Sequence, residues 1–276
     1  MSEPRSRTVR RGHVDLATWS WPSEGPPTLL LHGIGNYARY WDLLADAVHG
    51  RLSLVAADAR GHGDSGKPER SEAAYAPEEF VADALAILDT YGVARAAVVG
   101  HSMGAAHATA LASDRPERVS RLVLVDTSPE PLPEGAGRAR RLTLGRPERF
   151  ADLEEAMAYV RRTSPGYTEE VYANRRRWLF RETADGAQWR SSRTALATIL
   201  DEPRRHAEMW RALARVTAPT LVVRGTRSTV LGHETAERMA RTLPQGRLIE
   251  LEAGHNVPLE RPRELADAVA GLVEQP

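Results

Sequence analysis

The 276-residue chain contains no cysteine. Disulfide bridges, thiolate metal sites and cysteine nucleophiles are therefore excluded. No apolar run approaches the length needed to span a bilayer, and residues 1–5 lack the apolar core of a secretory signal. We therefore expect a cytoplasmic protein that does not associate with a membrane.

Neither sign of charge is in excess, because 37 Lys and Arg residues balance 37 Asp and Glu residues. This balance gives no electrostatic reason to expect a nucleic-acid partner. The sequence also lacks a metal-binding histidine pattern, and its glycine-rich loop at residues 61–66 has neither the context nor the spacing of a dinucleotide fingerprint. We expect chemistry on a small-molecule substrate that needs no cofactor and no metal.

Short apolar runs alternate with amphipathic helical patterns along most of the chain. The runs that read as buried strands are residues 28–31, 52–56, 96–99, 122–125, 220–224 and 248–251. This alternation predicts an α/β fold with a mostly parallel, doubly wound sheet covered on both faces. It stops at residues 127–215, which are rich in Pro and then in Arg. We predict a core of residues 1–126 and 216–276 and an inserted helical cap, or lid, of residues 127–215.

The sequence Gly100-His101-Ser102-Met103-Gly104 lies between one of these apolar runs and an Ala-rich helical segment. In that setting Gly-x-Ser-x-Gly predicts a nucleophile elbow, a sharp turn that presents Ser102 at the head of a helix. Glycines two positions before and after the serine let neighbouring chain approach closely. Polar residues end several other predicted strands, so we expect them to share one rim of the sheet with Ser102.

These motifs together resemble the α/β-hydrolase superfamily over essentially the whole chain. The matching landmarks are His32-Gly33-Ile34-Gly35, the loop of residues 58–65, the elbow at 100–104, and Gly254-His255-Asn256. The resemblance implies that Ser102 is the nucleophile, that His255 is the base, and that the backbone N–H groups of Ile34 and Met103 form the oxyanion hole. It implies supporting roles for the other histidines of these motifs.

The acid departs from the pattern of the superfamily. The loop after residue 225 usually carries an Asp, and Thr229 occupies the expected position. One interpretation is that the acid has moved to Asp126, at the end of the preceding strand, as in some branches of the superfamily. The other is that the acid is missing and Asp126 only caps a turn. Glu234 and Glu252 are minor candidates.

The main functional hypothesis is a serine hydrolase of a carboxylic ester or lactone, with an acyl-enzyme on Ser102. The serine argues against epoxide hydrolases and dehalogenases, whose nucleophile is a carboxylate. The alternatives are a carbon–carbon bond hydrolase, a ligand-binding receptor, and a non-hydrolytic isomerase or cyclase. We expect a bulky, mostly apolar substrate selected by the lid. The oligomeric state stays open, with a homodimer as one option.

Three further groups have two interpretations each. Trp178 could line a pocket under the lid or belong to the packed interior of the lid. The run Arg175-Arg176-Arg177 is typical of a solvated helix face, and binding of an anionic substrate is the alternative. Asp58, Arg60 and Asp64 are expected to form a buried charged network that fixes the glycine-rich loop.

Overall fold

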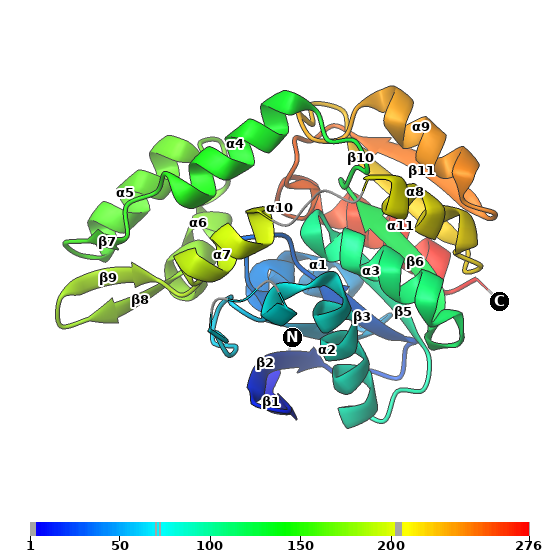
Figure 1. The fold of residues 1–276 in the computed structure, drawn as a ribbon, viewed down its shortest axis with the longest axis horizontal. Helices are drawn as coiled ribbons and strands as arrows, with labels where there is room; N and C mark the ends of the chain where they lie inside the picture. The colour runs from blue at the N-terminus through cyan, green and yellow to red at the C-terminus, as the bar shows by residue number, and fades with distance from the viewer. Residues whose placement is uncertain (1–3, 70, 72, 202–205, 276) are drawn as a thin grey trace.

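The computed structural model describes residues 4–69, 71, 73–201 and 206–275. In these residues eight strands form one sheet, in the order β1-β2-β4-β3-β5-β6-β10-β11 (Figure 1). β1 and β2 form an antiparallel hairpin at one edge, β2 also pairs antiparallel with β4, and the other neighbours are parallel. The strands are β1 (Arg5–Arg11), β2 (Val14–Trp21), β3 (Pro27–Leu31), β4 (Ser53–Ala57), β5 (Ala96–His101), β6 (Val119–Val125), β10 (Thr220–Gly225) and β11 (Gly246–Leu251). The predicted mostly parallel α/β sheet is confirmed.

Alternate residues of the central strands supply two hydrophobic cores, one on each face of the sheet. Val98 of β5 packs with the core on one face, and Val99 packs with the core on the other. Every residue of β5 is buried. Both faces are covered, which is why the strands read as continuous apolar runs.

Helices cover the two faces as two layers (Figure 1). The first core contains side chains of α1 (Asp42–Val48) and α11 (Pro262–Val273). The second contains side chains of α2 (Pro77–Thr90), α3 (Met103–Asp114), α8 (His206–Arg215) and α9 (His233–Thr242). Shorter helices are α10 (Val257–Glu260) and the 3₁₀ turns η1 (Ala38–Trp41), η2 (Ala73–Tyr75) and η3 (Pro116–Arg118).

The segment between β6 and β10 extends to one side of the sheet (Figure 1). Its helices before α8 are α4 (Pro133–Leu144), α5 (Leu153–Thr163), α6 (Glu169–Trp178) and α7 (Arg193–Asp201). The segment is not wholly helical as expected, because its described residues also form a three-stranded antiparallel sheet of β7 (Arg149–Phe150), β9 (Gly186–Trp189) and β8 (Phe180–Thr183). α8 differs from the rest of this segment, because it packs against α3 and α9 of the core.

The glycine-rich loop is not fixed by the expected network in which Asp58, Arg60 and Asp64 contact one another through their charged groups. Asp58 accepts hydrogen bonds from the backbone N–H groups of Ala38 and Asp64, each at 2.7 Å. Arg60 instead forms an ion pair with Asp83 of α2 at 2.8 Å. The Asp64 side chain forms an ion pair at 2.7 Å with Arg190, which follows β9. The three residues thus tie the loop to three different parts of the molecule.

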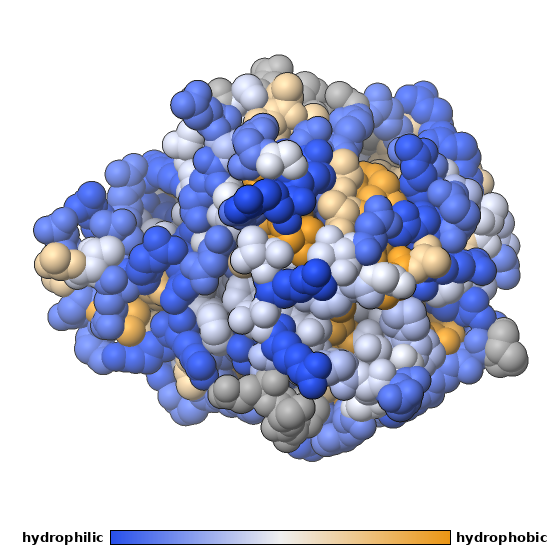
Figure 2. Space-filling view, turned by 90° about the horizontal axis from the view of Figure 1, so that it is seen from below, coloured by the Kyte–Doolittle hydropathy of each residue, from blue (hydrophilic) through white to orange (hydrophobic). Residues whose placement is uncertain are grey.

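The face shown in Figure 2 is predominantly hydrophilic, and its hydrophobic residues are seen mostly in recesses between polar side chains. Among the described residues, no helix has the length and apolar character needed to cross a membrane.

Candidate active site

Ser102 occupies the turn between β5 and α3. Its backbone has φ 53° and ψ −118°, a strained conformation for a residue with a side chain. Its N–H donates to the carbonyl oxygen of Val125 at 2.9 Å, which fixes the turn against β6. This is the geometry predicted for a nucleophile elbow.

The glycines on either side of Ser102 occupy places where no side chain fits. A Cβ atom on Gly100 would lie 2.4 Å from the Cα of Ala105, and one on Gly104 would lie 2.2 Å from the carbonyl oxygen of Leu31. The close approach of α3 to β3 and β5 therefore requires both glycines. The sequence analysis expected Gly100 and Gly104 to permit close approach of neighbouring chain, and the structure shows this approach at both glycines.

Asp126 and His255 are in direct contact. Asp126 Oδ2 lies 2.7 Å from His255 Nδ1, and the carboxylate is fully buried. An imidazole whose Nδ1–H donates to a carboxylate keeps Nε2 as the nitrogen that can accept a proton. Asp126 has a left-handed backbone, with φ 45°, a conformation that Asp tolerates better than most residues. The structure thus brings His255 to the carboxylate that follows β6.

The loop after β10, where the acid is expected in the superfamily, supports Asp126 instead. Ser228 Oγ donates to Asp126 Oδ2 at 2.5 Å, and the Gly225 N–H donates to Asp126 Oδ1 at 2.9 Å. The carbonyl oxygen of Thr229 accepts a hydrogen bond from the Gly135 N–H of α4. Ser228 was missed by the sequence analysis. The only indication of Ser228 in the sequence was its position next to Thr229, where the superfamily usually carries the acid.

His101 holds the loop that carries His255. Its Nε2 lies 2.9 Å from the carbonyl oxygen of His255, and its ring stacks on Tyr40 with centroids 5.4 Å apart. Burial lowers the pKa of His101 well below its usual value, and the neighbouring His255 lowers it further. His101 is therefore neutral, with the proton on Nε2 that donates to the carbonyl.

Two more buried histidines hold the loop that contains Ile34. His32 Nδ1 lies 2.8 Å from the Gly33 carbonyl oxygen, and His32 Nε2 accepts from the Ala59 N–H at 3.0 Å. His62 Nε2 accepts from the Gly35 N–H at 3.0 Å. Burial lowers the pKa of His32 to about 4 and that of His62 well below its usual value. Both rings are neutral, which lets each one accept a backbone N–H.

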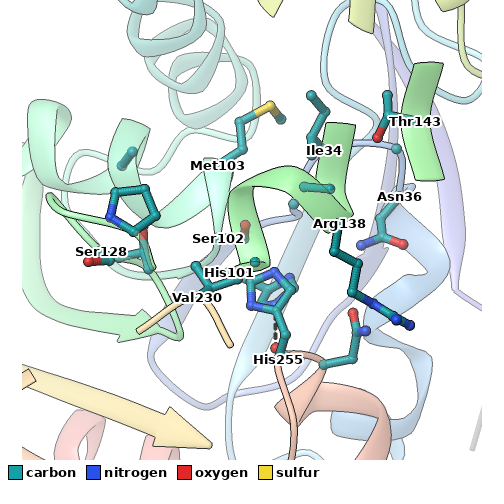
Figure 3. Close-up of a pocket in the computed structure, with 18 of the residues that line it drawn as sticks. Ile34, Asn36, His101, Ser102, Met103, Ser128, Arg138, Thr143, Val230 and His255 are labelled. Carbon is teal, nitrogen blue, oxygen red and sulfur yellow. Dashed lines mark hydrogen bonds between the residues drawn. The ribbon is translucent and has the colours of Figure 1, made fainter. Parts of the chain in front are cut away.

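The two backbone donors expected at the oxyanion hole are placed beside Ser102. Ile34 and Met103 line the same cavity as Ser102 and His255 (Figure 3). Met103 is the first residue of α3, where a helix leaves its N–H groups without intrahelical partners. Within the described part of the chain, neither N–H donates a hydrogen bond. Both N–H groups are free to donate to a group bound in the cavity.

The cavity has a volume of about 1010 Å³ and lies between the core and the segment that follows β6. Figure 3 shows Arg138 and Thr143 of α4 on one side of it, and Ser102, His101 and His255 on the other. Trp178 does not line it, which corrects the predicted pocket role. That side chain packs against Trp19 of β2, with ring centroids 5.8 Å apart, and under the guanidinium of Arg39. Among the described residues, no group of three or more His, Asp or Glu side chains could hold a metal ion.

Comparisons with known proteins agree on the fold of this chain. A family model for the alpha/beta hydrolase fold matches residues 26–262. The chain is 26% identical over 239 residues to 2-(acetamidomethylene)succinate hydrolase of Mesorhizobium japonicum, covering 87% of this chain and 84% of that protein. It is 28% identical over 277 residues to an esterase of Mycobacterium tuberculosis, covering 98% and 90% of the two chains.

A solved structure agrees in fold along nearly the full length. The crystal structure of E-2-(acetamidomethylene)succinate hydrolase superimposes with a TM-score of 0.88 at 25% identity, covering 99% of this chain and all of that one. The family match, the eight-stranded sheet and the elbow at Ser102 lead to the same conclusion. The protein belongs to the alpha/beta hydrolase fold family.

Proposed function

We propose that this protein is a serine hydrolase that cleaves a carboxylic ester or lactone without a cofactor. The observation that carries the proposal is the 2.7 Å contact between Asp126 Oδ2 and His255 Nδ1. With the carboxylate fully buried and His255 lining the cavity beside Ser102, the three side chains supply a nucleophile, a base and an orienting acid.

The proposed reaction uses these groups in the following order. Ser102 Oγ attacks the carbonyl carbon while His255 Nε2 takes the hydroxyl proton, and the Ile34 and Met103 N–H groups hold the oxyanion. His255 then gives the proton to the leaving alkoxide, which departs as an alcohol. Water attacks the acyl-enzyme with His255 as base, and the carboxylic acid is released.

The contact weighs against the binding-only and isomerase alternatives, because a carboxylate that orients His255 equips it to activate Ser102 for hydrolysis. The relatives support hydrolysis in general. One of them carries the name esterase, whereas 2-(acetamidomethylene)succinate hydrolase is not named for an ester. The ester or lactone class is therefore the part of the proposal that needs direct testing.

Residues 127–215 would act as the lid over this site. Arg138, Thr143 and Tyr159 of this segment line the cavity together with Ser102. A cavity of about 1010 Å³ suits a bulky substrate with a mostly apolar body. α8, which packs on the core, would anchor the end of the lid.

The test is hydrolysis of 4-nitrophenyl esters of increasing acyl length and of an aryl lactone, with mass spectrometry of the quenched protein. We expect turnover by the wild type, an acyl adduct on the peptide that contains Ser102, and loss of both in Ser102→Ala. Turnover that survives Ser102→Ala would reject the proposed nucleophile. Absence of turnover on every ester and lactone would reject the proposed substrate class.

A further inference from the structure

Arg175 on α6 is a buried cation without a counter-charge. Its side chain lines the cavity and is 9% exposed. Its Nε is buried and has no hydrogen-bond partner. Among the described residues, the guanidinium forms no ion pair and donates no hydrogen bond. Burial of an uncompensated cation is unfavourable, so this arrangement needs a reason.

The neighbouring cations of the same helix behave as ordinary surface residues. Arg176 is exposed and forms an ion pair with Glu154 at 2.7 Å. Arg177 is exposed and lies over the ring of Trp178. The run of three arginines is therefore a solvated face for two of its members, and only Arg175 turns into the cavity.

Tyrosine side chains lie near Arg175. The guanidinium lies over the ring of Tyr167 at 5.0 Å from its centroid. Burial raises the pKa values of Tyr37, Tyr40 and Tyr167, and the charge of Arg175 opposes each rise. The hydroxyl of Tyr37 donates to Asn174 and that of Tyr40 to Asn256, so both are already committed as donors.

The acidic residues near this end of the cavity are bound to other groups. Glu260 lines the cavity, but it accepts from the Gly254 N–H at 2.8 Å and pairs with Arg227 at 3.3 Å. Asp42 accepts from Arg39 and from the Asn174 amide. Neither carboxylate forms an ion pair with Arg175.

A second arginine, from another helix, lines the same cavity and acts on the same tyrosine. Arg138 of α4 extends toward the pocket (Figure 3). Its Nη2 donates to the Thr163 carbonyl oxygen at 3.2 Å, and its charge, like that of Arg175, acts on Tyr167. Arg138 is exposed, so it lies at the rim, whereas Arg175 lies inside.

This end of the cavity adjoins the proposed catalytic centre. Asn256, which accepts from the Tyr40 hydroxyl at 3.3 Å, directly follows His255. Tyr40 also stacks on His101, which directly precedes Ser102. A group held by Arg175 would therefore belong to the same small molecule as the carbonyl attacked by Ser102.

We infer that the cavity contains a carboxylate subsite formed by Arg175, with Arg138 at its rim, and that the substrate is an ester or lactone carrying a free carboxylate. The planar guanidinium matches a carboxylate with two parallel hydrogen bonds. The inference rests on the proposed hydrolase function and makes its substrate specific: an apolar body with one anionic end.

The test compares two esters of equal length, 4-nitrophenyl hemiadipate and 4-nitrophenyl hexanoate, with the wild type, Arg175→Met and Arg176→Met. Arg176→Met removes an exposed cation of the same helix and is the matched control. We expect the wild type to prefer the hemiadipate. Arg175→Met should lower kcat/KM for the hemiadipate about 10- to 100-fold, mainly through KM, because a charge-assisted hydrogen bond is lost. It should change the hexanoate rate less than about threefold, and Arg176→Met should change neither.

Equal losses on both esters in Arg175→Met would overturn the subsite, because they would indicate a structural role for Arg175. Calorimetric titration with adipate separates failure of this inference from failure of the proposed function. Adipate that binds the wild type, and binds Arg175→Met at least tenfold more weakly, supports the subsite even if neither ester is cleaved. Adipate that does not bind the wild type, or binds Arg175→Met equally well, overturns it even if both esters are cleaved.

Discussion

Asp126 combines a left-handed backbone with a fully buried carboxylate, and both features serve its contact with His255. One carboxylate oxygen accepts from the Gly225 N–H, and the other faces His255 and Ser228. Each oxygen is thus fixed by at least one donor, which limits rotation of the carboxylate. In the proposed reaction, the side chain is held ready for an imidazolium that forms only during turnover.

Asp126→Asn should therefore lower kcat on the order of 10⁴-fold, because the amide cannot stabilise the imidazolium or hold the correct tautomer. Asn tolerates the left-handed backbone as Asp does, so the melting temperature should change little. Steady-state kinetics on a cleaved ester and a thermal melt provide the measurement. Thr229→Asp is the companion variant, and we expect no gain in activity from it. A highly active Asp126→Asn, or a gain from Thr229→Asp, would contradict the relocated acid.

In the proposed reaction, Ser228 acts through Asp126 and is a positioning residue. Its hydroxyl donates to Asp126 Oδ2 and accepts the N–H groups of Val230 and Leu231. Ser228→Ala should lower kcat about tenfold with KM nearly unchanged, because one hydrogen bond to the carboxylate is lost while the substrate contacts stay.

A pH profile distinguishes positioning by Ser228 from a general loss of folding. With one donor fewer, the carboxylate is more basic and interacts more strongly with the imidazolium. The acidic limb of the kcat/KM profile should therefore move to higher pH in Ser228→Ala, whereas the conservative Ser228→Thr should restore the wild-type limb. An unshifted limb with lower activity in both variants would indicate a structural defect alone.

At the scale of elements, the approach of α3 to β3 decides where Ser102 stands. A Cβ atom on Gly104 would lie 2.2 Å from a backbone oxygen of β3, and backbone cannot move aside as a flexible side chain can. The same close approach lets the N-terminus of α3 point its free N–H groups at the site. The packing of α3 and the proposed oxyanion stabilisation therefore both require that residue 104 has no side chain.

We expect Gly104→Ala to destabilise the protein by about 1–3 kcal/mol, as overpacking does, and to reduce ester hydrolysis by moving Ser102. Gly271→Ala is the matched control, because Gly271 lies inside α11 and a Cβ atom there meets nothing within 4 Å. That control should gain about 0.5–1 kcal/mol from helix propensity. Urea unfolding and kinetics measure both effects. A Gly104→Ala variant as stable as Gly271→Ala would contradict the close packing.

At the scale of the whole molecule, buried neutral histidines make stability depend on pH. His32, His62 and His101 are at most 2% exposed, and each has a folded-state pKa below its unfolded value of 6.5. Below pH 6.5 the unfolded chain takes up protons that the native protein does not bind. The contribution of these three histidines to the free energy of unfolding is therefore present above pH 6.5 and is lost as the pH falls.

Asp58 acts in the opposite direction. Burial raises its pKa from 3.8 to about 6, so between these values the native protein holds a proton that the unfolded chain releases. Its contribution therefore increases stability as the pH falls through 6. One carboxyl group offsets part of the effect of these three imidazoles and of His107, whose pKa burial lowers to about 3, which leaves a net uptake of roughly three protons on unfolding near pH 5.5.

The free energy of unfolding should accordingly fall by roughly 4 kcal/mol per pH unit around pH 5.5 and be nearly constant above pH 7.5. Urea titrations at pH 7.5, 6.5 and 5.5 measure this. His13→Asn is the control, because His13 is exposed and should leave the slope unchanged. A stability that is flat between pH 7.5 and 5.5 would show that the buried rings do not resist protonation.

Local patterns in the sequence were sufficient to predict the sheet, the elbow and the position of Ser102 between β5 and α3. Each of these features depends on residues that are neighbours in the chain. The β8–β9 hairpin was missed although Asp185-Gly186 is a turn signal, since the Arg-rich context favoured helix. The contact between Asp126 and His255 and the burial of Arg175 depend on packing. Asp126 and His255 are 129 residues apart and meet only because parallel strands end at one rim of the sheet. Arg175 differs from Arg176 only in which side of α6 it occupies, and the packing of that helix over the cavity decides which arginine loses its water.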